Sequence, residues 1–154
     1  MTVFIIRFED IVHGLDLDIR KLRNILNEIS VEITDNEDYT RAYKDLFLKI
    51  RKLPPFKREK IKKLLAEWEA SVVNYAGFDK IIVETLARLK SKNARIFLTS
   101  MLSQKTLGML VKTYKLNALI EKIYGREYGF DEISRIKKIL AENKLDKKDV
   151  VYIG

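Results

Sequence analysis

The sequence has no cysteine, a single histidine and only two prolines among its 154 residues. Without cysteine the chain has no disulfide framework and no thiolate metal site, which excludes a small disulfide-stapled secreted domain. No apolar run approaches the roughly 20 residues that span a membrane. The first residues carry neither the basic region nor the small-residue cleavage site of a signal peptide. We therefore expect a soluble cytoplasmic protein without a membrane partner.

Several catalytic signatures are also missing. The chain has no Gly-rich phosphate loop, no Cys/His cluster and no serine-nucleophile motif. What is present is an apolar fraction of 47%, enough for one domain with a real core and too high for a disordered chain. Abundant Lys, Glu and Ile, with cysteine absent, are also typical of a thermophile.

The net charge of +8 is concentrated in one segment of this basic protein. Residues 41–63 hold ten basic and two acidic side chains, so their excess equals the net charge of the whole chain. A local excess of this size indicates an anionic partner, such as an anionic ligand, an acidic protein surface or nucleic acid. A solvated helix face explains the same pattern. The candidate basic patch consists of Lys57, Arg58, Lys60, Lys62 and Lys63.

Four short apolar segments predict strands, at residues 3–6, 95–99, 120–124 and 150–153. Each is nearly continuous in its apolar character, which is typical of parallel strands buried on both faces. From residue 78 onward helical patterns alternate with these strands. The helical faces comprise Ile82, Leu86 and Leu89, then Leu107, Leu110, Val111 and Tyr114, then Ile133, Ile136, Ile139 and Leu140. This order predicts an α/β fold with a doubly wound parallel sheet.

The segment of residues 15–75 carries helical patterns and no convincing strand. One helical face is formed by Leu22, Ile25, Leu26 and Ile29, and another by Ile61, Leu64, Leu65, Trp68 and Val72. Pro54-Pro55 ends one helix, and Lys57 begins the next. We therefore expect residues 15–75 to form a helical module inserted into an α/β core of residues 1–14 and 76–154, with Gly77 as the hinge of re-entry.

The first strand runs directly into Arg7-Phe8-Glu9-Asp10. This resembles the start of haloacid-dehalogenase-superfamily (HAD) proteins, whose first strand ends in Asp-x-Asp, often with a bulky apolar residue at x. In that family the first Asp is the nucleophile and the second is the general acid and base. Phe8 matches x, whereas Arg7 and Glu9 stand at the two catalytic positions. The resemblance implies a Rossmann-like HAD fold with a helical cap after the first strand and with degenerate chemistry.

The strand of residues 95–99 is similar to the family's second motif, an apolar strand ending in Thr or Ser whose hydroxyl holds a phosphoryl oxygen. Thr99 takes that place and Ser100 follows it. A hydroxyl at the carboxyl end of a strand, facing a helix N-terminus, is well placed for an anion. Thr99, Ser100 and Arg7 are therefore candidate anion-binding residues. Alternatively, Thr99 caps the helix that begins near Ser103.

Residues 145–154 resemble the family's last strand, which continues past a glycine into one or two metal-binding Asp residues. The sequence stops at that glycine. Counting back from it, the family's motif lysine would fall near Phe130 or Asp131, neither of which is a cation. Arg135 or Lys137 would reach the site only from a different helical turn.

Two contacts of Arg7 are predicted. Arg7 and Glu9 are separated by one residue, so in a continuing strand they share a face and form a structural ion pair. If Gly154 is the natural terminus, its α-carboxylate could instead pair with Arg7 across neighbouring strands.

We interpret the chain as a HAD-like protein that has lost phosphohydrolase activity and serves as a binding or interaction module. No catalytic residue, metal ligand or cofactor is assigned. A first alternative is a divergent HAD-family phosphatase acting with Mg²⁺ on a small phosphorylated substrate, with the missing groups supplied by other residues. A second alternative is nucleic-acid binding through the basic insert.

Overall fold

The computed structural model describes residues 1–13, 27, 39–72, 77–129 and 131–154. The chain divides into two compact units, one formed by Met1–Leu15 with Tyr75–Gly154 and the other by Asp16–Asn74. The helix expected around Leu22 to Ile29 has its four apolar positions outside the described residues. The role of the second unit as a cap stays a prediction.

The first unit is built on a four-stranded parallel sheet with the order β5-β4-β1-β6. The strands are β1 (Val3–Arg7), β4 (Arg95–Thr99), β5 (Lys122–Tyr124) and β6 (Val150–Ile153). They confirm the predicted parallel α/β fold. β5 begins two residues later than expected, because Ile120 still donates its N–H to Leu116 in the preceding turn.

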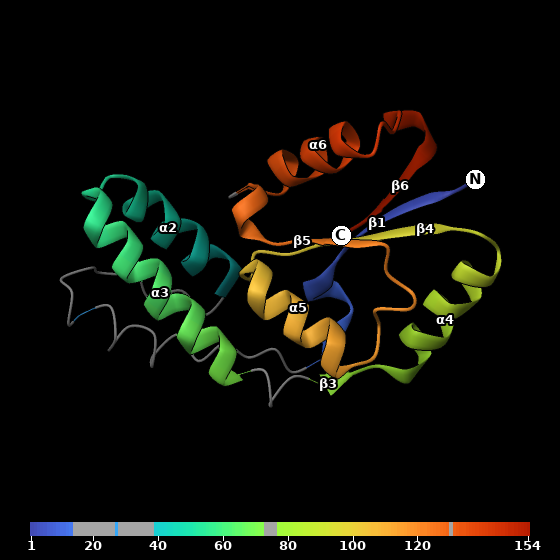
Figure 1. Ribbon diagram of the computed structural model, residues 1–154, viewed down its shortest axis with the longest axis horizontal. Helices are drawn as coiled ribbons and strands as arrows, with labels where there is room; N and C mark the ends of the chain where they lie inside the picture. Colours follow the sequence, from blue (N-terminus) through green and yellow to red (C-terminus); the bar gives the residue numbers. More distant parts are fainter. Residues whose placement is uncertain (14–26, 28–38, 73–76, 130) are drawn as a thin grey trace. The chain divides into compact units, whose positions relative to one another are not determined.

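Three helices cover this sheet: α4 (Lys80–Ser91), α5 (Gln104–Thr113) and α6 (Glu132–Glu142). Figure 1 shows α6 on one face of the sheet and α4 and α5 on the other. Each helix begins at a side chain that accepts a backbone N–H of its first turn, namely that of Asp79, Ser103 or Asp131. These caps fix where each helix starts relative to the strand before it.

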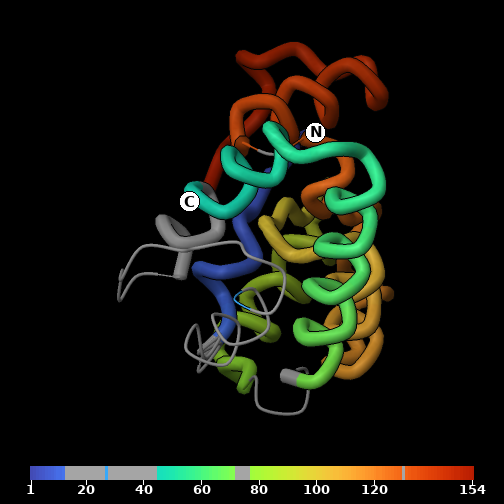
Figure 2. The backbone as a smooth tube through the Cα atoms, turned by 90° about the vertical axis from the view of Figure 1, so that its left-hand side faces the viewer, coloured from blue at the N-terminus to red at the C-terminus, as the bar shows by residue number. Residues whose placement is uncertain are grey.

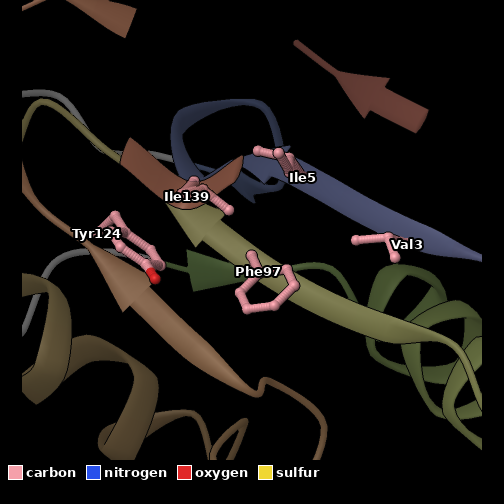
Figure 3. Close-up of a cluster of buried hydrophobic side chains, with 5 residues drawn as sticks. All are labelled: Val3, Ile5, Phe97, Tyr124 and Ile139. Carbon is pink, nitrogen blue, oxygen red and sulfur yellow. The ribbon is translucent and has the colours of Figure 1, made fainter. Parts of the chain in front are cut away.

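The core beneath α6 follows the alternation of side chains along the strands. Val3 and Ile5 of β1 and Phe97 of β4 point to the same face and pack with Tyr124 and Ile139 (Figure 3). The next position of β1 on that face is Arg7, and its partner in the register is Thr99 of β4. The sheet therefore carries its polar residues at the carboxyl end, directly after the apolar core.

A second, two-stranded antiparallel sheet pairs β2 (Val12–His13) with β3 (Gly77–Phe78). Gly77, the predicted hinge of re-entry, lies in this ribbon opposite His13. The ribbon holds the chain together where it leaves and re-enters the α/β unit. Two-residue strands are too short to show an apolar alternation, so no pattern in the sequence predicts them.

In the second unit, α2 (Tyr39–Arg51) and α3 (Pro55–Val72) are joined by a short turn (Figures 1 and 2). α3 begins at Pro55, two residues before the expected Lys57, because proline at the first helical position needs no N–H partner. Both helices bury apolar side chains: Leu46, Phe47 and Ile50 of α2, and Ile61, Leu65 and the only tryptophan, Trp68, of α3. Among the described residues, no helix is both long and apolar enough to cross a membrane.

Gly125, directly after β5, gives a test of the packing between β5 and α5. Its backbone (φ −78°, ψ −176°) suits any residue, but an added Cβ would lie 2.5 Å from the Gln104 nitrogen and 2.9 Å from the Leu102 oxygen. We expect Gly125→Ala to lower the free energy of unfolding by about 1–3 kcal/mol, because backbone rather than side chain must move. Urea denaturation measures this change.

Gly108→Ala is the matched control, because the nearest atom to its added Cβ is Ile123 Cδ1 at 3.6 Å. Gly108 lies inside α5, so this change should raise stability by about 0.5–1 kcal/mol. Equal effects of the two substitutions would contradict the close approach at Gly125.

Candidate functional site

The carboxyl end of β1 holds Arg7, whose guanidinium is bound by Asp10. Arg7 Nε and Nη2 donate to the two carboxylate oxygens of Asp10 at 2.7 and 2.6 Å. Glu132 Oε1 of α6 lies 4.0 Å from Arg7 Nε. The hydrogen bonds that Arg7 donates to Asp10 are the main reason why the pKa of Arg7 is raised above its usual value. The position that resembles a nucleophile is therefore a cation held by carboxylates.

The predicted pair of Arg7 with Glu9 is wrong. β1 ends at Arg7, and the 3-10 helix η1 (Phe8–Asp10) begins at the next residue. The alternation of a strand therefore does not continue to Glu9, and the turn of η1 directs Asp10 to Arg7 instead. In the described part of the chain, the ion pairs of Arg7 join it to Asp10 and Glu132 rather than to the carboxylate of Gly154.

Glu9 instead reaches across to the loop after β4. Its Oε1 accepts the hydroxyl of Ser100 at 2.6 Å and the backbone N–H of Met101 at 2.9 Å. Its Oε2 is buried and has no hydrogen-bond partner among the described residues. Burial raises the pKa of Glu9, and the hydrogen bonds from Ser100 and Met101 oppose that shift only in part. The two donors that follow β4, the Ser100 hydroxyl and the Met101 N–H, are thus both bound to the Glu9 carboxyl group.

Thr99, the last residue of β4, is buried and binds a cation of α6. Its Oγ1 accepts the Nε–H of Arg135 at 2.7 Å. The Arg135 side chain is 1% exposed and donates from Nη1 to Gly129 O at 2.9 Å. Thr99 does not cap α5, because Ser103 takes that role and accepts the N–H of Thr106.

Arg135 reaches the site from α6. It lies one helical turn after Asp131, the different turn that the sequence indicates, and it contacts Thr99 directly. The signal was present, because Arg135 lies four residues before the buried Ile139 and thus on the buried face of α6. An arginine on the buried face of an amphipathic helix indicates a buried polar contact.

The loop after β5 adds a second cation and a second carboxylate. Arg126 is 7% exposed and donates to the carbonyl of Met101 at 3.3 Å. Glu127 Oε2 accepts the N–H of Gln104, the first residue of α5, at 2.7 Å. The sequence reasoning singled out neither residue, although both follow the carboxyl end of a parallel strand, where binding groups gather. Met101 and Gln104 therefore both donate their backbone N–H groups to carboxyl groups of the protein itself.

These residues do not fit a magnesium ion. Mg²⁺ needs oxygen ligands, usually with one or two carboxylates. Asp10 is bound by the Arg7 guanidinium, and Glu9 accepts two hydrogen bonds from the β4 loop. Within the described ranges, no group of three or more His, Cys, Asp or Glu side chains is arranged to hold a metal ion.

The candidate basic patch lies on α3, in the second unit. Lys57, Lys60, Lys62 and Lys63 are exposed, and Arg58 is half-buried. Glu59 is the one acidic residue between Lys57 and Lys63, and it pairs with Lys62 at 3.1 Å. The patch is therefore a solvent-facing helix surface with a net positive charge.

The chain was compared with known families and proteins. The sequence profile of a family described as haloacid dehalogenase-like hydrolase matches residues 11–154. The match begins directly after Asp10, so Arg7 and Glu9 lie outside it. Among curated proteins, none matches the sequence significantly.

Solved structures of similar fold include CbbY from Rhodobacter sphaeroides in complex with phosphate, at 12% identity and a TM-score of 0.74 over 99% of this chain and 76% of that one. A putative haloacid dehalogenase-like hydrolase from Bacteroides fragilis has 16% identity and a TM-score of 0.71, covering 99% and 78%. A hydrolase of the same family from Streptococcus pneumoniae has 15% identity and a TM-score of 0.67, covering 100% and 75%. At these identities the likeness concerns the fold alone.

The Arg7–Asp10 contact gives a test of the charges at this edge. We expect Arg7→Ala to lower the melting temperature by about 2–4 °C, because Asp10 and Glu132 lose their counter-ion. Differential scanning calorimetry measures the shift.

The control is the same substitution in an Asp10→Ala background. There the loss should be smaller, since the main partner of Arg7 is already absent. An equal loss in both backgrounds would show that Arg7 acts through packing and not through this ion pair.

Proposed function

Because the chain belongs to the haloacid dehalogenase-like hydrolase family, we propose that it keeps the family's fold as a binding module that does not hydrolyse phosphate esters. One observation carries the proposal. The position that resembles the family's nucleophile is Arg7, and its guanidinium is fixed by two hydrogen bonds to Asp10.

The chemistry of phosphoryl transfer supports this proposal. Transfer through an aspartyl intermediate needs a carboxylate nucleophile and a divalent cation that offsets the charge of the transferring group. A guanidinium supplies neither a nucleophile nor a metal ligand, and it repels a cation. Asp10 is nearby, but its two oxygens accept from Arg7, which leaves it poorly placed as a nucleophile.

The position that resembles the general acid and base supports the same conclusion. Glu9 has the right chemical type, but its Oε1 is engaged by Ser100 and Met101. Those donors are the ones that a phosphoryl oxygen would need at the end of β4. The related CbbY structure holds phosphate, which makes a phosphate ester a suitable substrate for testing turnover in this chain.

The test is hydrolysis of p-nitrophenyl phosphate in the presence of Mg²⁺. We expect no metal-dependent turnover above that of buffer, because the chain offers Arg7 where a carboxylate is needed. An active phosphatase assayed in parallel verifies the conditions. Turnover that requires Mg²⁺ and is lost in Glu9→Gln would overturn the proposal in favour of a divergent phosphatase.

A second candidate function rests on α3. The exposed lysines between Lys57 and Lys63 form a positive surface, and the single carboxylate in that stretch, Glu59, is already paired with Lys62. Such a surface attracts an anionic partner, and phosphate contacts of this kind give a strongly salt-dependent affinity. We propose that the second unit binds an anionic macromolecule, with nucleic acid as the class to test first.

Retention on a heparin column measures this property. We expect the chain to elute at lower salt when four exposed lysines of α3 are changed to Gln: Lys57, Lys60, Lys62 and Lys63. The matched control removes the same charge from the first unit by changing Lys105, Lys112, Lys137 and Lys144, which are also exposed. Equal shifts for both sets would show that net charge alone, and not the α3 surface, causes retention.

A further inference from the structure

The loop after β4 has the composition of an anion-binding site. The hydroxyl of Ser100 and the N–H of Met101 converge on a single oxygen, Glu9 Oε1. The Ser100 hydroxyl oxygen in turn accepts the N–H of Leu102 at 3.0 Å, which fixes its direction. Backbone and hydroxyl donors that converge in this way are typical of sites that bind oxyanions.

Buried cations lie next to these donors. Arg135 binds Thr99, the residue directly before Ser100, and Arg126 binds the carbonyl of Met101. Both arginine side chains are buried, at 1% and 7% exposure. Their positive charges make the loop favourable for a negative group. The two arginines do not explain why the oxygen that accepts from Ser100 and Met101 belongs to Glu9.

The fit of Glu9 is incomplete. Its Oε2 is buried without a hydrogen-bond partner among the described residues, at a cost in desolvation. A residue placed only to stabilise the fold would gain from a partner on both oxygens. The Glu9 carboxyl group is thus bound through Oε1 alone, and Oε2 lies where the described residues offer no donor.

We infer that the donors after β4 form an anion-binding site that Glu9 closes from within as a tethered internal ligand. The site suits a tetrahedral oxyanion of the phosphate or sulfate class, and the Glu9 carboxyl group excludes such an anion by occupying its donors. Glu9 and the neighbouring Met101 are both half-buried, so we expect truncation of the Glu9 side chain to open the buried Ser100 hydroxyl and the Met101 N–H to solvent. The inference rests on the proposed function, because a site closed in this way cannot receive a phosphate ester.

The test is a titration with inorganic phosphate, followed by the amide resonance of Met101 in nitrogen-15 NMR spectra. We expect a saturable shift in Glu9→Ala, and no saturable shift in the unaltered chain at phosphate concentrations up to about ten times the Kd of that variant. Sulfate should act similarly, and chloride at matched ionic strength should not.

Two variants separate occupancy from charge. Glu9→Gln keeps an oxygen that accepts from Ser100 and Met101, so it should stay closed to phosphate although its charge is gone. Ser100→Ala in the Glu9→Ala background removes one donor and should weaken phosphate binding. Phosphate binding by Glu9→Gln equal to that of Glu9→Ala would overturn the inference, as would no binding by folded Glu9→Ala.

A second measurement covers the case in which Glu9→Ala does not fold. Hydrogen exchange at the Met101 amide should be slow in the unaltered chain and in Glu9→Gln, because both offer it an acceptor. Exchange at the rate of an unprotected amide would overturn the inference. Turnover of p-nitrophenyl phosphate by the unaltered chain would overturn the proposed function. Phosphate binding by the unaltered chain at these donors, without turnover, would overturn the closed site alone.

Discussion

The parallel pairing of β1 with β4 and β6 is the constraint on which the rest of the α/β unit depends. Parallel strands end at the same edge, and the register sets Arg7 beside Thr99. Strand alternation then directs both residues to the face covered by α6. Arg135 and Glu132 at the start of α6 meet them there. The polar network at this edge is therefore a consequence of backbone pairing more than of any single side chain.

At this edge of the sheet, the positive and negative charges stand on the opposite elements from those that the family resemblance implies. The family's pattern has a carboxylate at position 7 and a lysine near residues 130 and 131. This chain has a cation at Arg7 and a carboxylate at Glu132, and the two lie 4.0 Å apart. The opposite charges of Arg7 and Glu132 attract each other between β1 and α6.

Much of the α/β unit could be predicted from sequence, because its strands are short apolar runs and its helices carry clear apolar faces. β1, β4 and β6 lie where their apolar residues indicated. The site was harder to predict, since its contacts depend on where β1 stops. Two further residues of strand after Arg7 would have placed Glu9 on the Arg7 face, whereas η1 turns Glu9 toward Ser100. Local periodicity carries no information about such an ending.

Partners distant in sequence were also beyond the reach of pattern reasoning. Glu9 and Met101 are brought together only by the pairing of β1 with β4, and Arg135 reaches Thr99 only because α6 crosses the sheet. Spacing along the chain identified Thr99 and Ser100 as polar residues at a strand end. It could not show that the protein itself supplies their partners.

The position of the only tryptophan has a practical consequence. Trp68 is buried in α3, and the α/β unit contains tyrosine but no tryptophan. Tryptophan emission therefore reports the melting of the helical unit alone, whereas near-ultraviolet dichroism also includes the tyrosines of the α/β unit, such as Tyr124. Two optical signals from the unaltered chain can thus show whether its two units unfold together or one after the other.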